Sequence, residues 1–311
     1  MKEKRVVFMG TPVFAVPVLE KLIENTNVVL VVSQPDKEVG RKKLKQMTPV
    51  KEVAVKHNIP VFQPEKIRKD YEPIIEVKPD LIITCAYGQI IPEVLLKLPK
   101  LGAINVHASL LPKYRGGAPI HWALIKGEKR TGVTIMYMDK GMDTGDMISK
   151  AAYNIKPDDN VGTLHEVLSS IGANLLIETL PSIINHTNQR EKQDEEKASY
   201  AYNIKREDER IDLNKHGEEV INKIRGLNPF PTANILVNGE EFKILEASFV
   251  PHSNTAPGKV REVTKNSIGI DVLDGTIYVT HLKPFGKKAM NTKDYLNGVQ
   301  KENIIDWQIN A

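Results

Sequence analysis

Short apolar runs and stretches of helical spacing alternate along the first half of the chain. The runs are almost wholly hydrophobic, as strands buried on both faces of a parallel sheet are, and they cover residues 6–9, 28–32, 81–84 and 103–107. After the first run, the apolar residues that follow Pro17 recur at helical spacing. Strands that alternate with helices predict an α/β domain with a Rossmann-like parallel sheet.

A long amphipathic pattern closes this domain, and its apolar stripe consists of Leu164, Val167, Leu168, Ile171, Leu175 and Leu176. The residues that follow, 187–204, are polar and charged and show no periodicity, which is typical of an exposed connector. We therefore predict a first domain over residues 1–186, a linker over 187–204 and a second domain over 205–311.

The second domain is predicted to consist mainly of β-strands. A helix near residues 220–227 ends before the Asn-Pro-Phe-Pro sequence at 228–231. Five short strands follow, at residues 232–237, 241–249, 259–264, 267–273 and 277–282. Asn238 and Gly239 form a strong two-residue hairpin signal between the first two. Such strands predict a small OB-like β-barrel, whose usual ligands are oligonucleotides, although the fold alone does not establish that use.

Composition excludes several classes of protein. The 311 residues, 41% of them hydrophobic, suffice for two cores. The single cysteine, Cys85, excludes an internal disulfide and a cysteine-cluster metal site. We expect a cytoplasmic protein without a metal site, because the N-terminus has no signal-peptide pattern and no apolar stretch approaches the ~20 residues of a membrane helix. The first predicted turn reads GTPVFA and not G-x-G-x-x-G, so we expect no NAD or FAD site.

Positive charge is concentrated in one segment of the first domain, although the net charge of +4 is modest. The basic residues of this segment, which have only Glu38 as an acidic neighbour, are Lys37, Arg41, Lys42, Lys43, Lys45 and Lys51. Gly40 and Pro49 favour a loop here. The sequence therefore indicates a local basic arm.

Asn105 and His107 stand two residues apart at the end of a predicted strand, so both side chains point to the same face. The carboxyl edge of an open α/β sheet is where ligands bind. An amide can stabilise an oxyanion while an imidazole transfers a proton, a pairing that suits acyl-type transfer. Asp143, from another loop, could orient the imidazole.

Each of these residues also has an ordinary structural interpretation. A lone histidine in a chain with eight of them is more often structural than catalytic, and Asn105 could cap or turn the chain. Asp143 lies between Gly141 and Gly145, and Asp146 follows Gly145, so both aspartates could belong to a simple Asx-turn loop.

Several segments, spread along the whole chain, resemble one enzyme family. They are NVH, SLLPKYRGGAPI and DKGMDTGD, together with FMGTPVFAVPVL, QPDKEVGRKK, AYGQIIP, IRGLNPFPTA and the GKKAM tail. With them the chain resembles the folate-dependent formyltransferases, and within that family the enzymes that formylate methionine on initiator tRNA.

This resemblance implies a set of roles. The catalytic Asn, His and Asp of the family fall on Asn105, His107 and Asp143. The folate-contacting segments fall on Ser109, Leu110, Leu111 and Pro112 and on Gln89, Ile90 and Ile91. The implied co-substrate is 10-formyltetrahydrofolate. The implied partner is the acceptor arm of initiator methionyl-tRNA, bound through Arg41, Lys42, Lys43 and Lys45. We expect the enzyme to be a monomer.

Two alternatives remain open. A different folate-dependent formyl enzyme, such as a formate-releasing hydrolase or a transferase acting on a sugar or nucleotide amine, would carry the same Asn, His and Asp. The basic arm and the second domain favour tRNA over a small amine. A nucleic-acid-binding module without activity is the other alternative, and the intact trio argues against it.

Overall fold

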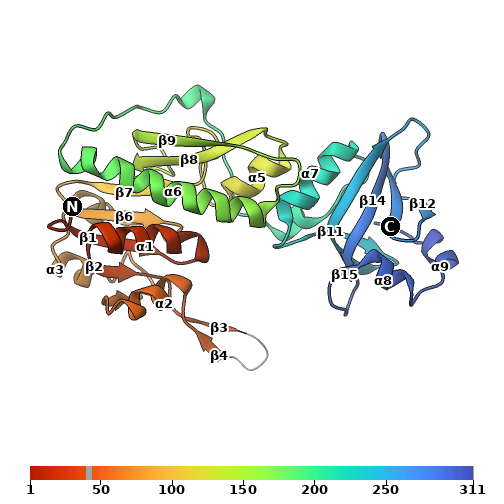
Figure 1. Cartoon of the computed structure of the whole chain (residues 1–311), viewed down its shortest axis with the longest axis horizontal. Helices are drawn as coiled ribbons and strands as arrows, with labels where there is room; N and C mark the ends of the chain where they lie inside the picture. Colours follow the sequence, from red (N-terminus) through yellow and green to blue (C-terminus); the bar gives the residue numbers. More distant parts are fainter. Residues whose placement is uncertain (40–43, 311) are drawn as a thin grey trace. The chain divides into compact units, whose positions relative to one another are not determined.

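The computed structural model describes residues 1–39 and 44–310, which divide into two compact units (Figure 1). The first unit comprises Met1–Pro119, Arg130–Asn154 and His165–Tyr202. The second comprises Ile120–Lys129, Ile155–Leu164 and the chain from Asn203 onward. Two short segments from the first 186 residues thus join the second unit, an arrangement set by long-range packing that local periodicity does not encode.

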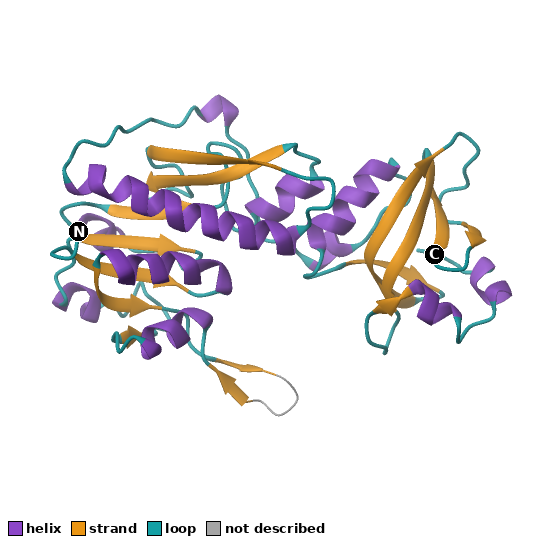
Figure 2. Ribbon diagram, in the orientation of Figure 1, coloured by secondary structure: helices purple, strands orange, loops and turns teal. Residues whose placement is uncertain are grey.

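A seven-stranded sheet forms the framework of the first unit (Figures 1 and 2). Its order is β5-β2-β1-β6-β7-β8-β9. The strands are β1 (Arg5–Gly10), β2 (Asn27–Val32), β5 (Val61–Phe62), β6 (Leu81–Cys85), β7 (Ala103–His107), β8 (Arg130–Tyr137) and β9 (Met147–Asn154). From β5 to β7 all neighbours are parallel, so the carboxyl ends of these strands meet at one edge.

The sheet is mixed, which corrects the prediction of a purely parallel one. β8 runs antiparallel to β7, and β9 runs antiparallel to β8. A parallel pair needs a long crossover, usually through a helix, whereas β8 and β9 are joined by the short loop 138–146. That loop contains Asp143, so the antiparallel turn is what brings this residue back to the edge of the sheet.

Helices flank the sheet (Figure 2). They are η1 (Val13–Ala15), α1 (Val16–Asn25), α2 (Pro49–Lys56), α3 (Glu72–Glu76), α4 (Glu93–Lys97) and α6 (Val161–Ile184). Pro17 lies in the first turn of α1, as predicted. Buried residues of β1, β2 and β6, together with Ile67, Ile74 and Leu95, form one hydrophobic core on the sheet.

The long helix α6 corrects one expectation. Within residues 1–39 and 44–310 it is the one helix that is long and apolar enough, by length and composition alone, to cross a membrane. The part of this 24-residue helix that belongs to the first unit, from His165 onward, packs along the sheet. A Cβ added to Gly172 would lie 2.9 Å from the side chain of Val106 in β7 and 3.3 Å from that of Val133 in β8.

The segment predicted as a basic loop is more regular than expected. β3 (Lys37–Val39) and β4 (Leu44–Gln46) form an antiparallel hairpin, and Pro49 begins α2 behind the Thr48 cap. Lys51 lies in α2, where it forms an ion pair at 2.5 Å with Asp36, an acidic neighbour that the sequence-based prediction overlooked. Lys51 is therefore a structural cation and not part of an exposed arm.

The second unit contains an antiparallel sheet in the order β10-β11-β14-β13-β12, with β15 on β14. Its elements are α5 (Pro119–Ile125, in this unit from Ile120 onward), η3 (Arg206–Glu209), α7 (Gly217–Leu227), β10 (Ala233–Val237), β11 (Glu240–Pro251), β12 (Val260–Val263), β13 (Ile268–Val272), β14 (Gly275–Lys283), β15 (Met290–Asn291), α8 (Thr292–Leu296) and α9 (Lys301–Ile305). The helix and five strands lie where the sequence places them. Asn238 and Gly239 both have positive φ, 51° and 81°, as a tight hairpin turn requires.

The core of this unit is apolar and partly aromatic. Phe242 packs edge-on against Tyr295 and Trp307, with ring centroids 6.1 and 5.3 Å apart. These contacts attach the C-terminal helices to the sheet, a feature the strand pattern did not predict. In the described chain no ladder joins β10 to β12. The structure therefore shows an antiparallel sheet, and a closed OB-like barrel stays a prediction.

Candidate active site

Asn105 and His107 lie at the carboxyl end of β7 and face the same side of the sheet. Parallel pairing sets Asn105 beside Thr84 of β6, and antiparallel pairing sets His107 beside Thr134 of β8. Asn105 is half-buried, and His107 is only 6% exposed. The sheet thus fixes the position of both side chains at the edge where ligands of α/β proteins bind.

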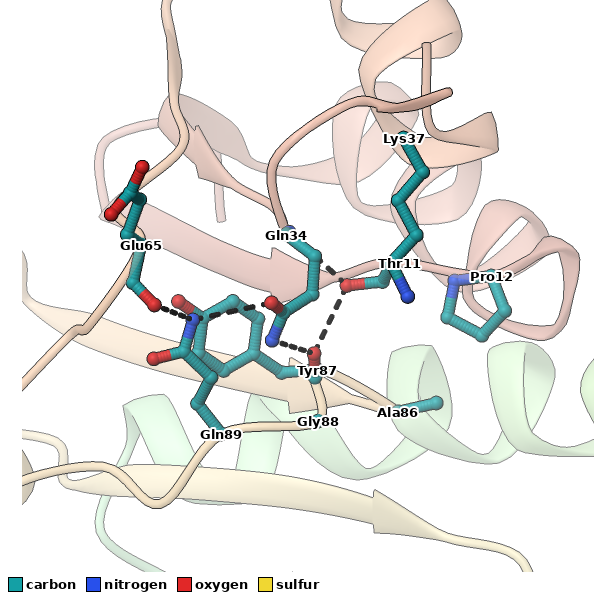
Figure 3. A pocket seen from close by; sticks show the side chains of 9 residues that line it. All are labelled: Thr11, Pro12, Gln34, Lys37, Glu65, Ala86, Tyr87, Gly88 and Gln89. Carbon is teal, nitrogen blue, oxygen red and sulfur yellow. Dashed lines mark hydrogen bonds between the residues drawn. The ribbon is translucent and has the colours of Figure 1, made fainter. Parts of the chain in front are cut away.

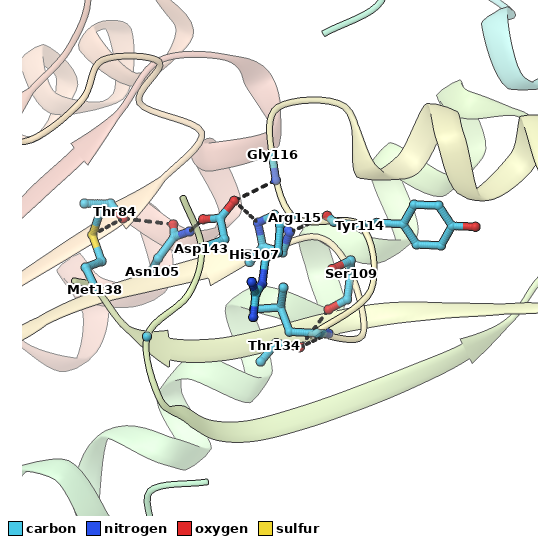
Figure 4. A network of polar contacts seen from close by, with 12 residues as sticks. Thr84, Asn105, His107, Ser109, Tyr114, Arg115, Gly116, Thr134, Met138 and Asp143 are labelled. Atoms are coloured by element: carbon cyan, nitrogen blue, oxygen red, sulfur yellow. Dashed lines mark hydrogen bonds and ion pairs between the residues drawn. The ribbon is translucent and has the colours of Figure 1, made fainter. Parts of the chain in front are cut away.

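The amide of Asn105 has a defined orientation (Figure 4). The hydroxyl of Thr84 donates a hydrogen bond to its Oδ1 at 2.9 Å, so Nδ2 is the end that faces the site. Nδ2 lies 3.4 Å from Oδ1 of Asp143, to which it donates a long hydrogen bond. The contact of Thr84 with Asn105 was not predicted from the sequence. The position of Thr84 as a polar residue in the apolar run LIITC is a signal that could have indicated this role.

The two nitrogens of His107 have different neighbours. Nε2 lies 2.9 Å from the carbonyl oxygen of Tyr114. A carbonyl only accepts, so Nε2 carries a proton in this contact. Nδ1 faces Oδ2 of Asp143 at 3.6 Å. Nδ1 is consequently the nitrogen left for proton transfer: it accepts a proton when the ring is neutral and donates one when the ring is charged.

Asp143 reaches these residues from the loop between β8 and β9. Its backbone has φ of +53°, a left-handed conformation that is costly for a residue with a side chain. The backbone N–H of Gly116 donates to Oδ2 at 2.8 Å. Figure 4 shows the carboxylate between Asn105 and His107. The structure thus brings the three residues singled out in the sequence into one cluster.

The segment from Ser109 to Pro112 packs largely inward. Ser109 is 1% exposed and donates to the carbonyl of Lys113 at 2.7 Å. Leu111 is 2% exposed and packs with Met136 and Met147. Leu110 lies against β8 beside Gly132, and Pro112 is half-buried. The visible role of this segment is to support the loop that follows β7, and its contact with folate stays a prediction.

The loop at Gln89 to Ile91 leaves the carboxyl end of β6, next to β7. The amide of Gln89 is engaged within the protein: its nitrogen donates to Gln34, Pro64 and Glu65, and its oxygen accepts from the backbone of Ile67. Ile91 is buried in the core. Ile90 is 68% exposed. Of the three residues implied to contact folate here, Ile90 is the side chain open to a ligand.

A polar cavity of about 530 Å³ opens at the ends of β1, β2 and β6 (Figure 3). It is lined by Thr11, Pro12, Gln34, Lys37, Glu65, Ala86, Tyr87, Gly88 and Gln89. Hydrogen bonds from Thr11 (3.0 Å) and Gln34 (3.2 Å) to the carbonyl of Tyr87 hold its wall. The cavity is shallow and open to solvent, so its volume alone does not mark an enclosed small-molecule site. Burial raises the pKa of Tyr87 to about 12.

The four residues implied to bind tRNA are only partly described. Arg41, Lys42 and Lys43 lie outside the described residues. Lys45 lies in β4, is exposed and pairs across the hairpin with Glu38. Among residues 1–39 and 44–310 no group of three or more His, Cys, Asp or Glu side chains could hold a metal ion.

Comparison with known proteins assigns the chain to a family. The formyl transferase model matches residues 4–180, and the formyl transferase C-terminal domain model matches residues 203–300. A methionyl-tRNA formyltransferase from Staphylococcus epidermidis is 51% identical over 303 residues, which cover 96% of this chain and 98% of that protein. The chain belongs to the methionyl-tRNA formyltransferase family. A relative from Bacillus subtilis is 52% identical over 303 residues, which cover 96% of each chain.

Solved structures share the fold of this formyltransferase at lower identity. WlaRD, a sugar 3N-formyl transferase crystallised with dTDP and 5-N-formyl-THF, has a TM-score of 0.66 at 21% identity, over 92% of this chain and 99% of its own. A variant of HypX from Aquifex aeolicus has a TM-score of 0.66 at 18% identity, over 96% of this chain. The formyltransferase spans about half of HypX, 48% of its length.

Proposed function

We propose that this formyltransferase transfers the formyl group of 10-formyltetrahydrofolate to the α-amino group of methionine on initiator methionyl-tRNA, for translation initiation. The observation that carries the proposal is the cluster at the end of β7, in which Nδ2 of Asn105 and Nδ1 of His107 both face the carboxylate of Asp143. The family and its curated relatives support the identity of the two substrates.

Asn105 has the role of an oxyanion donor in this proposal. When the amine attacks the formyl carbon, negative charge develops on the formyl oxygen. A donor fixed before the reaction stabilises that charge without reorganising. Because Thr84 occupies Oδ1, the Asn105 amide presents Nδ2, and one of its two hydrogens remains for the substrate oxygen.

His107 transfers protons through Nδ1. The attacking nitrogen must lose a proton and the folate nitrogen must gain one, so a single group that first accepts and then donates can serve both steps. The Tyr114 carbonyl occupies Nε2, which leaves Nδ1 for this exchange. Asp143, 3.6 Å from Nδ1, orients the ring and stabilises its positive charge between the two steps.

Apolar and backbone groups beside the cluster suit a flat, partly apolar pterin. Ile90 offers an exposed aliphatic side chain on the loop after β6, the strand next to β7. The segments at Ser109–Pro112 and Gln89–Ile91 are otherwise internally bonded or buried, so we propose that they bind folate mainly through backbone groups.

The acceptor arm of the tRNA is proposed to bind the β3–β4 hairpin, through Lys45 together with Arg41, Lys42 and Lys43. Lys37 and Lys45 are exposed on its two strands. We propose further that residues 205–311 form a separate domain, joined by the linker 187–204, whose β-sheet assists tRNA binding as an OB-like barrel would. The enzyme is proposed to act as a cytoplasmic monomer, where translation supplies its substrate.

Mass spectrometry of the aminoacyl product tests the function. The protein is incubated with 10-formyltetrahydrofolate and methionyl-charged initiator tRNA, and the methionine is released and weighed. Addition of one formyl group is expected. Formate release without tRNA would indicate a hydrolase instead, and formylation of an amino sugar or amino nucleotide in preference to the tRNA would indicate a small-molecule transferase.

A further inference from the structure

The segment predicted as an exposed connector is tied along much of its length to the loop after β7, residues 108–118, which we call the catalytic loop. We call residues 190–202 the strap; it includes η2 (Glu195–Lys197) and belongs to the first unit. The backbone N–H of Arg115 donates to the carbonyl of Ser199 at 2.8 Å, and that of Ala201 donates to the carbonyl of Arg115 at 2.7 Å. Ala118 then donates to Ala201 at 2.9 Å. A mere connector has no need for such strand-like pairing.

Gln193 of the strap holds the backbone on which Asp143 is carried. Its side-chain nitrogen donates to the carbonyl of Asp143 at 2.7 Å and to that of Gly145 at 2.8 Å, so both amide hydrogens are used. Asp143 is in a left-handed conformation, with φ of +53°, which persists only where surrounding contacts impose it. Gln193 supplies two of those contacts.

Arg115 fixes Gln193 in turn. The Arg115 side chain is fully buried, and its Nε donates to Oε1 of Gln193 at 3.0 Å. Its terminal nitrogens form a two-bond pair with Glu195 at 2.9 and 2.7 Å. A buried guanidinium is tolerated only when it is paired, and Gln193 and Glu195 of the strap supply these partners. The planar fork defines the direction of the Nε–H toward Gln193.

The backbone and the carboxylate of Asp143 therefore both depend on this network. Its backbone is held by Gln193, and its carboxylate accepts from Gly116, the residue after Arg115. A Cβ on Gly116 would lie 2.8 Å from the carbonyl of Ala201, so strap and catalytic loop are in direct contact at this point. A shift of the strap would move the Asp143 carboxylate relative to His107.

We propose that Gln193 and Arg115 are positioning residues, which hold the carboxylate of Asp143 in register with His107 and Asn105. The inference rests on the proposed function, because it assumes that Asp143 serves the reaction. It assigns to the strap a part in catalysis that neither its exposure nor its sequence pattern indicates.

The first test is Gln193→Ala, assayed for formylation under single-turnover and steady-state conditions. We expect kcat to fall roughly 10–100-fold, because misplacing a reacting group by about 1 Å costs on the order of 10²-fold. The KM values for folate and tRNA should stay unchanged, since Gln193 contacts Asp143 and Gly145 only through their backbone. Gln193→Glu keeps the size but turns acceptors toward the two carbonyls, and should be at least as slow. Glu196→Ala, an exposed position on the same strap, is the matched control and should keep the wild-type kcat.

A double-mutant cycle with Asp143→Asn distinguishes a specific effect of Gln193 on the position of the Asp143 carboxylate from a general loss of structural order. If Gln193 acts through the Asp143 carboxylate, Gln193→Ala should cost much less in the Asp143→Asn background than in wild type. Equal losses in both backgrounds, or a wild-type kcat for Gln193→Ala, would overturn the inference while leaving the proposed function intact. A wild-type rate for Asp143→Asn alone would remove Asp143 from the mechanism and overturn the inference, while the formylation it measures would still support the proposed function. Thermal unfolding of each variant shows whether the fold is retained.

Discussion

The hydroxyl of Thr84 donates to Oδ1 of Asn105 at 2.9 Å, across the parallel pair of β6 and β7. This contact determines which end of the amide faces the site. Without it, oxygen and nitrogen could exchange places by rotation about the terminal torsion of the side chain, and an oxygen would then face the developing oxyanion. The orientation of the proposed oxyanion donor is thus set by a residue on the neighbouring strand.

Thr84→Val tests this orientation. Valine keeps the shape and removes the hydroxyl, so Asn105 loses the partner of its oxygen and spends part of its time with Nδ2 turned away. We expect kcat to fall roughly 10-fold, the rate equivalent of one neutral hydrogen bond of about 1.4 kcal/mol, with little change in KM for either substrate. Thr84→Ser retains the donor and is the control. A wild-type kcat for Thr84→Val would show that the amide needs no such restraint.

Replacement of the two side chains on β7 should slow the chemical step directly. Asn105→Ala removes the proposed oxyanion donor, a contact of a kind worth ~10²–10³ in rate, and His107→Ala removes the proposed general acid–base, of a kind worth ~10²–10⁴. The rates are to be measured with folate and tRNA both saturating. Near-normal turnover of either variant would contradict its assigned role.

The positions of the strands could be predicted from the sequence because they depend on local pattern. The apolar run 103–107 predicts a strand that ends at Asn105 and His107, and β7 has the same bounds. The spacing could not reveal how Asp143 reaches them, since this depends on the antiparallel return of β9 and on a left-handed turn. Nor could polarity and lack of periodicity reveal that residues 190–202 pair with the catalytic loop. Contacts between segments far apart in the sequence leave no local periodicity.

Ile90, whose side chain is exposed, is a better position than the buried Leu111 at which to test folate binding. Ile90→Asp should raise the KM for 10-formyltetrahydrofolate and leave the KM for tRNA unchanged, because a charge on an open apolar surface disfavours a flat apolar ring without disturbing the core. Leu111→Asp places the same charge at a site that is 2% exposed, and should instead destabilise the fold. If Ile90→Asp leaves both KM values unchanged, the loop after β6 does not bind folate.

Asp271 in β13 makes the stability of the second unit pH-dependent. Burial opposes its ionisation, but hydrogen bonds from Arg261, Thr276 and the backbone of Ala256 together outweigh burial and hold the pKa of Asp271 below its ordinary value. A pKa that is lower in the folded state adds stability above the unfolded pKa of about 3.9, and this stability is lost as pH falls through the folded pKa.

Asp271→Asn should therefore destabilise the second unit by about 1–3 kcal/mol at pH 7, with a difference from wild type that shrinks below about pH 4. The measurement is thermal unfolding followed by tryptophan fluorescence. Trp122 and Trp307, the two tryptophans of the chain, both belong to this unit, so the signal reports on it specifically. A difference that is constant from pH 7 to pH 3 would show that the charge of Asp271 is not the cause.

The β3–β4 hairpin should bind tRNA through its positive charge. Each phosphate neutralised by a Lys or Arg releases counterions, so log affinity falls with log salt by about 0.7–0.9 per contact. Replacing Arg41, Lys42 and Lys43 by Ala should flatten this slope by ~2–3 units if each meets a phosphate, and should leave folate binding unchanged. The slope is measured as the Kd for initiator methionyl-tRNA over a salt series.

A matched variant distinguishes specific contacts from the loss of net charge. The exposed residues Lys66, Arg68 and Lys69 of the first unit carry the same charge in the same residue types. Their replacement by Ala should leave the slope nearly unchanged, because a charge that meets no phosphate releases no counterions.

Comparison of Arg41→Ala with wild type on initiator and elongator methionyl-tRNA then tests selectivity. If the variants at Arg41, Lys42 and Lys43 keep both the wild-type slope and the wild-type preference, tRNA recognition must reside in the second unit.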